Sequence, residues 1–380
     1  MHKSKVNLFN KDSIDTLDWP DHEEAQHVKS FVEPLIKEGT KTYIDNVDSE
    51  FCVLQINNHV LPVTISQFSK ENSYVCSLHG QYVRYAREQM RNQNSFLNFF
   101  VKPLTHIFDK LIKWGDLDRL IVVNNWLFST NLYPELKKTE LEDIVQFLTK
   151  KYSNYTICFR CVNQFDTKEL FHNLKKTGFE TVFSRPIFIF DPQEKKAFKS
   201  RMIKSDLKLL KETDYKVLKH DQIPLSAAVR LKELYSSLYL DKYSKLNPQL
   251  NEKFFNLLIE KKVFELQAVE KDGVIDGIVG NYSRNGVMTS PLFGYDPQKL
   301  EVGVYRIIST ILALNAKEKK MILNQSAGAA SFKKLRRATK HLEYNALYVK
   351  HLNSKRKICW KVFKGIINSF GIPTMKYFDV

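Results

Sequence analysis

The chain has few of the residues that break or cross-link a fold. Its 380 residues include only 13 glycines, 12 prolines and 5 cysteines. A small, odd number of cysteines in so long a chain argues against a disulfide framework. No window holds about 18 consecutive apolar residues, so we expect no membrane-spanning helix. Residues 1–26 lack the apolar centre of a secretory signal, which favours a cytoplasmic protein.

Several motifs that mark catalytic sites are absent as well. There is no H-E-x-x-H, no G-x-S-x-G and no Walker A sequence, and the 10 histidines are scattered. Cys158 and Cys161 form a C-x-x-C pair, but they fall in a predicted strand, where residues three apart point to opposite faces. We therefore expect no metal site and no nucleophile triad.

Positive charge is abundant and unevenly placed. The net charge is +16, and residues 317–364 hold 14 Lys or Arg against 2 acids, which gives +12 for that stretch. A solvated basic face is one explanation. The alternatives are contact with a phosphate-bearing ligand, an acidic protein, anionic lipid or nucleic acid.

The hydrophobic pattern repeats one order of elements twice: a three-stranded meander, a helix, a strand, a helix and a strand. In the first half, strands are predicted over 51–56, 59–65, 73–79, 119–125, 156–162 and 180–191, and helices over 22–39, 82–113 with a break near Pro103, 134–150 and 167–179. In the second half, strands are predicted over 263–270, 274–283, 287–295, 320–325 and 342–349, and helices over 205–212, 226–240, 251–261, 301–318 and near 329–338. Turns at Asp272-Gly273 and Asn285-Gly286 indicate hairpins.

This order predicts an α/β protein of two side-by-side units, each a mixed, mostly antiparallel sheet flanked by helices. The predicted limits are 1–20 for a loose N-terminus, 21–195 for the first domain, 196–352 for the second, and 353–380 for a C-terminal basic amphipathic helix and tail. The tail pattern fits a helix that packs on its domain. It also fits an interfacial membrane helix or a docking helix for an acidic carrier protein.

The second half resembles the GNAT superfamily, the acyl-CoA N-acyltransferase fold. The resemblance rests on the two hairpins, on Phe293-Gly294-Tyr295-Asp296-Pro297, and above all on Leu323-Asn324-Gln325-Ser326-Ala327-Gly328-Ala329-Ala330-Ser331-Phe332-Lys333-Lys334-Leu335-Arg336. It covers about residues 205–350 and is most similar to the tandem Fem-type and cellulose-biosynthesis-type acetyltransferase-like branch. It implies two GNAT-like units, of which the first is degenerate and the second holds the active cleft.

One segment departs from the superfamily pattern. Members that use acetyl-CoA usually carry an Arg/Gln-x-x-Gly-x-Gly/Ala turn whose backbone N–H groups bind the pyrophosphate. Residues 294–304 of this chain keep Gly303 but add Asp296 and Glu301, which would repel a phosphate. Fem-type members also lack the turn, and some take their acyl group from aminoacyl-tRNA. Acyl-CoA, an acyl-carrier protein and aminoacyl-tRNA therefore stay open as donors.

The resemblance and the residue types together select candidate site residues. A turn of small residues before a basic helix suits a phosphate or a pantetheine group, or else is a capped surface helix. Amide acylation needs a base, a stabilised oxyanion and an acid that reprotonates the thiolate, for which a Glu and a Tyr are suitable. The cofactor-binding candidates are Ser326, Gly328, Ser331, Lys333, Lys334 and Arg336, and the catalytic candidates are Tyr282, Asn324, Glu343 and Tyr344.

A polar and aromatic run after the strand at 119–125 is a candidate wall for the acceptor, because ligands gather at the carboxyl ends of strands in α/β sheets. The alternative is a loop rich in side-chain caps. The substrate-binding candidates in this run are Asn125, Trp126, Ser129 and Asn131.

We therefore predict an acyltransferase that moves an acyl group from a thioester donor, acyl-CoA or acyl-carrier protein, to an amine or hydroxyl. The acceptor would be a small molecule or lipid-linked, peripheral membrane contact is compatible with the tail, and nucleic acid is expected only as tRNA. The alternatives are a Fem-type aminoacyl-tRNA-dependent transferase and a non-catalytic binding or membrane-surface protein that keeps the fold.

Overall fold

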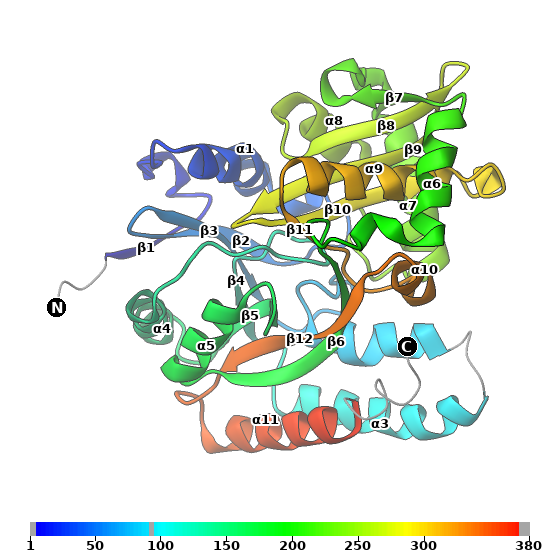
Figure 1. Ribbon diagram of the computed structural model, residues 1–380. Helices are drawn as coiled ribbons and strands as arrows, with labels where there is room; N and C mark the ends of the chain where they lie inside the picture. The colour runs from blue at the N-terminus through cyan, green and yellow to red at the C-terminus, as the bar shows by residue number, and fades with distance from the viewer. Residues whose placement is uncertain (1–4, 91–94, 372–380) are drawn as a thin grey trace. The chain divides into compact units, whose positions relative to one another are not determined.

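The computed structural model describes residues 5–90 and 95–371 and shows two compact α/β units (Figure 1). Unit 1 contains the residues up to Ser184, Ser244–Gln249 and the residues from Glu343 onwards. Unit 2 contains Arg185–Tyr243 and Leu250–Leu342. The predicted fold class is confirmed: each unit has a mixed, mostly antiparallel sheet with helices on its faces. The residues from 353 onwards, predicted as a separate tail, belong to unit 1.

The sheet of unit 1 has one parallel pair, β4 with β5, among antiparallel neighbours. Its strand order is β1-β2-β3-β4-β5-β12. The strands are β1 (Val6–Phe9), β2 (Glu50–Ile56), β3 (His59–Ser66), β4 (Leu120–Val123), β5 (Thr156–Asn163) and β12 (Thr339–Tyr348), and β6 (Glu180–Phe190) runs from unit 1 into unit 2. Within residues 5–20 the expectation of a loose N-terminus is wrong, because Val6 pairs with Ile56 and β1 extends the sheet, whereas residues 1–4 lie outside the described residues.

Six α-helices accompany this sheet within the described part of unit 1. They are α1 (Glu23–Glu38), α2 (Ala86–Met90), α3 (Ser95–Trp114), α4 (Lys138–Lys151), α5 (Lys168–Thr177) and α11 (Ser354–Ile366). Pro103 lies inside α3 and does not break it, contrary to the prediction. The strand predicted over 73–79 is also wrong. The backbone N–H groups of Leu78 and His79 donate to Oδ1 of the buried Asp118, at 2.7 and 3.0 Å. They are therefore not available for hydrogen bonds to a neighbouring strand.

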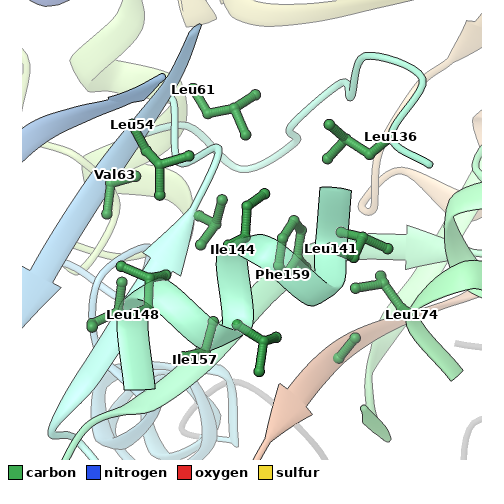
Figure 2. Close-up of a cluster of buried hydrophobic side chains, with 14 of the residues drawn as sticks. Leu54, Leu61, Val63, Leu136, Leu141, Ile144, Leu148, Ile157, Phe159 and Leu174 are labelled. Atoms are coloured by element: carbon green, nitrogen blue, oxygen red, sulfur yellow. The ribbon is translucent and has the colours of Figure 1, made fainter. Parts of the chain in front are cut away.

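The core of unit 1 lies between its sheet and helices α4 and α5. Leucines and valines of β2 and β3 face the apolar side of α4, and Phe159 of β5 lies among them (Figure 2). Along α4 the buried positions are Leu141, Ile144, Val145 and Leu148, which recur at the spacing of one helix face. The helix pattern in the sequence therefore reports a real core contact.

The C-terminal helix α11 is anchored to unit 1 by its inner face. Arg356 is buried, and its guanidinium donates to the carbonyls of Gly115 and Asp116 at 3.2 and 2.8 Å. Trp360 donates to the hydroxyl of Thr156 at 3.0 Å. The inner face of α11 therefore packs on its domain, as one of the alternatives for the tail predicts.

The sheet of unit 2 has the order β6-β11-β10-β9-β8-β7, with one parallel pair, β10 with β11. The strands are β7 (Lys216–Lys219), β8 (Glu265–Lys271), β9 (Val274–Arg284), β10 (Val287–Tyr295) and β11 (Ile322–Asn324), and the helices are α6 (Arg201–Glu212), α7 (Ala228–Ser236), α8 (Glu252–Lys261), α9 (Val304–Glu318) and α10 (Ala330–Leu335). Both predicted hairpins form, with Asp272, Gly273, Asn285 and Gly286 at positive φ. A short edge strand, β7, escaped prediction because it is largely exposed and has no apolar alternation.

Helix α9 covers one face of this sheet, as the orange ribbon in Figure 1 shows. Gly277 on β9 is required there, because a Cβ would come within 2.8 Å of the Val304 side chain. Val279 of β9 and Met288 of β10 face the same core. Among the described helices of both units, none is long and apolar enough to cross a bilayer.

The first prediction concerns the core shown in Figure 2. We expect Leu148→Ala to lower the free energy of unfolding by about 2–5 kcal/mol, because it opens a cavity between α4 and the sheet. Urea denaturation measures it. Glu142→Ala on the same helix is the control, since it removes only an exposed ion pair with Lys138 and should change stability by about 0.5 kcal/mol or less. Equal effects of the two substitutions would contradict the assigned core.

Candidate active site

The sheet of unit 2 opens where its two parallel strands separate. Strands β10 and β11 share only three paired positions, the last of which is Thr289 with Asn324. The hydroxyl of Thr289 donates to the carbonyl of Asn324 at 2.9 Å and closes this last rung. Beyond it, the register of β10 on β9 shifts between Thr289 and Leu292. A bulge of this kind re-aims the strand, and beyond Thr289 β10 has no pairing with β11.

The chain after β11 keeps its pairing with β6 after the pairing with β10 has ended. The N–H of Gln325 donates to the carbonyl of Phe188 at 2.9 Å, and the N–H of Phe188 donates to the carbonyl of Ser326 at 3.0 Å. The turn that follows takes left-handed backbone conformations at Ser326, Gly328 and Ala329. Glycine is needed at 328, where φ is +77° and a Cβ would also lie 3.3 Å from the hydroxyl of Tyr243.

Lys333 donates hydrogen bonds to the backbone of this turn. Its ammonium group is buried and donates to the carbonyls of Gln325, Ser326 and Ala327, at 2.6, 3.3 and 2.7 Å. Burial, and next the positive charge of Arg185, lowers the pKa of Lys333 to about 7. The three carbonyls favour the charged form and so act against this shift. Lys333 therefore fixes the path of the chain at the point where β11 leaves β10.

Arg336 is committed to an internal ion pair. Its Nε and Nη2 donate to the two carboxylate oxygens of Asp206 on α6, at 2.5 and 3.1 Å, and its guanidinium lies 3.4 Å from the centre of the Phe332 ring. Arg306 of α9 donates to the same carboxylate at 2.6 Å. Asp206 is only 2% exposed. One buried carboxylate thus pairs with two arginines, which leaves a net charge of +1, and connects α6 and α9 to Arg336 at the end of α10.

An aromatic cluster lies beside the turn. The ring of Tyr305 on α9 contacts those of Phe293, Tyr295 and Phe332, with centroids 5.6, 5.3 and 4.6 Å apart. Lys242 donates to the Tyr295 hydroxyl at 3.1 Å. Burial raises the pKa of Tyr305, so this phenol stays protonated at neutral pH.

Three buried amide atoms near the separation have no hydrogen-bond partner among the described residues. Asn281 of β9 stands opposite the register shift of β10, is 3% exposed, and has neither its Oδ1 nor its Nδ2 satisfied. The Oε1 of Gln325, the first residue after β11, is likewise buried and unsatisfied. Leaving such a group unpaired costs about 1–3 kcal/mol each, so a ligand that pairs with them would recover that free energy.

The four catalytic candidates divide between the units. Tyr282 and Asn324 belong to unit 2, whereas Glu343 and Tyr344 lie on β12 in unit 1. Burial raises the pKa of Tyr282 well above its usual range. Asn324 is buried and accepts the N–H of Ser326 at 2.9 Å, so it shapes the turn. The roles predicted for these residues stay predictions.

The cofactor-binding candidates fall into two groups. Lys333 and Arg336 have the internal partners described above. Gly328 and Ser331 are exposed, and Ser326 and Lys334 are half-buried. Helix α10 has only six residues, so its dipole contributes little to anion binding.

The predicted acceptor wall in unit 1 is buried and internally bonded. The side-chain amide of Asn125 donates to the Thr64 hydroxyl at 2.9 Å, and the backbone N–H of Trp126 donates to the Oδ1 of Asn131 at 3.1 Å. The indole of Trp126 stacks on Phe31 at 5.3 Å. Ser129 is half-buried, and its carbonyl accepts from the Cys161 thiol at 3.3 Å. This arrangement agrees with the alternative of a capped loop, while a binding role of these residues stays a prediction.

Sequence reasoning missed Asp206, Lys242 and Tyr305. Asp206 stands in an ordinary amphipathic helix, where an acid next to lysines looks like a surface ion pair. Only its 2% exposure distinguishes it. Within 5–90 and 95–371, no group of three or more His, Cys, Asp or Glu is arranged to hold a metal ion.

Comparison with known proteins gives distant structural similarity only. No family model matches the chain, and no curated protein matches it in sequence. Among solved structures, L-PGS from Bacillus licheniformis is similar at 12% identity over 65% of this chain and 83% of its own, with a TM-score of 0.45. FemX is similar at 11% identity over 54% and 75%, with a TM-score of 0.43. A GCN5-related N-acetyltransferase from Kribbella flavida is similar at 10% identity over 91% and 71%, with a TM-score of 0.35. Similarity at this level transfers no activity to this chain.

The second prediction follows from the buried Lys333. Its pKa of about 7 in the folded state lies below the value of an unfolded lysine, about 10.4. Between these values the unfolded chain binds more protons, so stability rises with pH by up to about 1.4 kcal/mol per unit. We expect the stability of the natural protein, relative to Lys333→Met, to increase from pH 7 to pH 9 in urea denaturation. Parallel pH profiles would contradict the assignment.

Proposed function

We propose that unit 2 is an acyltransferase domain that moves an acyl group from a thioester donor to an amine. The observation that carries this proposal is the separation of β10 from β11 after Thr289 and Asn324, with the unsatisfied amides of Asn281 and Gln325 beside it. An extended donor with amide groups, such as a pantetheine arm, can lie along the open edge of β10 and pair with backbone and side-chain amides. A strand edge is a ready template for such pairing.

The reaction asks little covalent chemistry of the protein. The amine nitrogen attacks the thioester carbonyl, a C–N bond forms, the C–S bond breaks, and the amine proton leaves while the thiolate is protonated. The protein must hold the two reactants together, stabilise the oxyanion and accept and return a proton. Backbone N–H groups of β10 beyond Thr289, where its pairing with β11 has ended, would stabilise the oxyanion, although Pro291 supplies none. Burial keeps the hydroxyl of Tyr282 protonated, but Tyr282 directly follows Asn281 on β9, so the two side chains point to opposite faces of the sheet.

The ion pairs of Asp206 bear on which donor unit 2 would bind. Coenzyme A carries a pyrophosphate that needs unoccupied positive charge or backbone N–H groups. Arg306 and Arg336 already pair with Asp206, and Arg230 pairs with Asp296 at 2.7 Å. These contacts favour a pantetheine arm attached to a carrier protein, whose recognition does not depend on a pyrophosphate. Acyl-CoA remains the simplest donor with which to test the proposed site between β10 and β11.

The third prediction tests the donor site between β10 and β11 by a substitution that should raise stability and lower turnover. Asn281→Leu replaces an unsatisfied buried amide with an apolar side chain of similar shape, so it should raise stability by about 1–2 kcal/mol. The same substitution should lower thiol release from acyl-CoA and acyl-carrier protein, with a panel of amines, at least tenfold (~1.4 kcal/mol). Thermal denaturation and a thiol-release assay measure the two effects.

Gln267→Leu on β8 is the matched control. Its amide accepts from Asn315 at 2.5 Å, so its loss should lower stability while turnover is kept. Absence of thiol release with every donor and amine would contradict the proposed function. Unchanged turnover in Asn281→Leu would leave a transferase whose donor binds elsewhere.

A further inference from the structure

Helices α3 and α11 of unit 1 pack side by side, as the cyan and red ribbons in Figure 1 show. Phe363 of α11 meets Phe108 of α3 with ring centres 5.0 Å apart. Gly115, just after α3, allows the close approach, because a Cβ there would lie 2.7 Å from the Cβ of Cys359. The inner faces of both helices are thereby fixed to unit 1, and their outer faces remain open.

These outer faces carry large apolar side chains. On α3, Ile107 and Trp114 are 42% and 60% exposed and stand seven residues apart, so they share one side of the helix. On α11, Ile358 and Val362 are 58% and 42% exposed and stand four residues apart. The ammonium group of Lys355 lies 4.8 Å from the Trp114 ring centre, which brings the two stripes next to each other.

Lysines surround this apolar strip on both helices. All of the following are exposed: Lys102, Lys110, Lys113, Lys355, Lys357 and Lys361. Helix α11 contains no acid, and the one acid among the described side chains of α3, Asp109, is half-buried and bonded to Lys113 and His79. We call these lysines, with Ile107, Trp114, Ile358 and Val362, the lysine-framed face.

We propose that the lysine-framed face binds the surface of an anionic lipid bilayer. This inference concerns unit 1 and is independent of the transferase function proposed for unit 2. Interfacial helices insert an apolar stripe at the level of the headgroups while basic side chains pair with lipid phosphates. Tryptophan favours that level, and lysine stems are long enough to follow the apolar stripe while keeping the ammonium in water.

The side chains favour a bilayer over an acidic protein. Every exposed cation of the face is a lysine, and the one arginine of α11, Arg356, is buried against backbone carbonyls. Specific carboxylate recognition uses the planar fork of arginine, whereas lysine acts as a mobile point charge. A field of diffuse negative charge with apolar depth beneath it matches lysines around an exposed Trp, Ile and Val.

The test is co-sedimentation of the full chain with vesicles of phosphatidylcholine alone and of phosphatidylcholine with phosphatidylglycerol. We expect binding to the anionic vesicles, weakened by salt, and at least ~10-fold weaker partitioning for Lys357→Glu with Lys361→Glu. Ile358→Gln with Val362→Gln should weaken it by a similar factor without changing the charge. All four positions are exposed, so the variants should fold.

Because the whole chain carries +16, a charge-matched control is essential. Lys70→Glu with Lys168→Glu changes two exposed lysines of unit 1 outside the face, and its binding should stay within about twofold of the natural protein. Trp114 emission should shift to shorter wavelength with anionic vesicles, and Trp114→Phe should remove that shift. Equal losses in the control pair, no vesicle binding, or binding to an acidic carrier protein without vesicle binding would overturn the proposal.

Discussion

The arrangement of unit 2 depends on the point where the pairing of β11 with β10 ends. The pairing with β6 continues past this point through the bonds of Gln325 and Ser326 with Phe188, and the chain then turns through three left-handed residues. Such a turn stores backbone strain and exposes carbonyls that need donors. The Nζ of Lys333 donates to these carbonyls and so stabilises the turn. The separation of β10 from β11 thus depends on the hydrogen bonds of the buried Lys333 and on the last β10–β11 pair, Thr289 with Asn324.

A second constraint acts around the same opening. Asp206 draws Arg306 and Arg336 inward and holds the helices on either side of the aromatic cluster. Removing the Asp206 carboxylate would leave the buried guanidinium of Arg336 without compensation, which makes this carboxylate a fixed part of the architecture. Part of the positive charge in residues 317–364, that of Arg336, is therefore paired inside unit 2. We infer that a donor is better recognised by amide and backbone groups than by arginines.

Most of the fold could be predicted from the sequence, and the reasons are local. The hairpins follow from Asp272-Gly273 and Asn285-Gly286, and the cores follow from the period of α4 and α9. The errors arise where tertiary contacts overrule local pattern. Asp118 draws the backbone of residues 78 and 79 away from a strand, and β1 owes its existence to the edge of β2. The candidate site was harder, because burial decides whether a lysine or an aspartate serves a ligand or the fold. Nothing in the sequence distinguishes Lys333 from Lys334, although the structure buries only the first.

The measurement that tests the central claim most directly is photo-crosslinking with an acyl thioester that carries a diazirine in its acyl chain, followed by peptide mapping. The opening between β10 and β11 predicts labelled peptides that contain residues 290–292 and 325–327, with loss of label when unmodified donor is added in excess. Label confined to other parts of the chain, or no competition by the donor, would contradict the claim that this strand separation is the donor site.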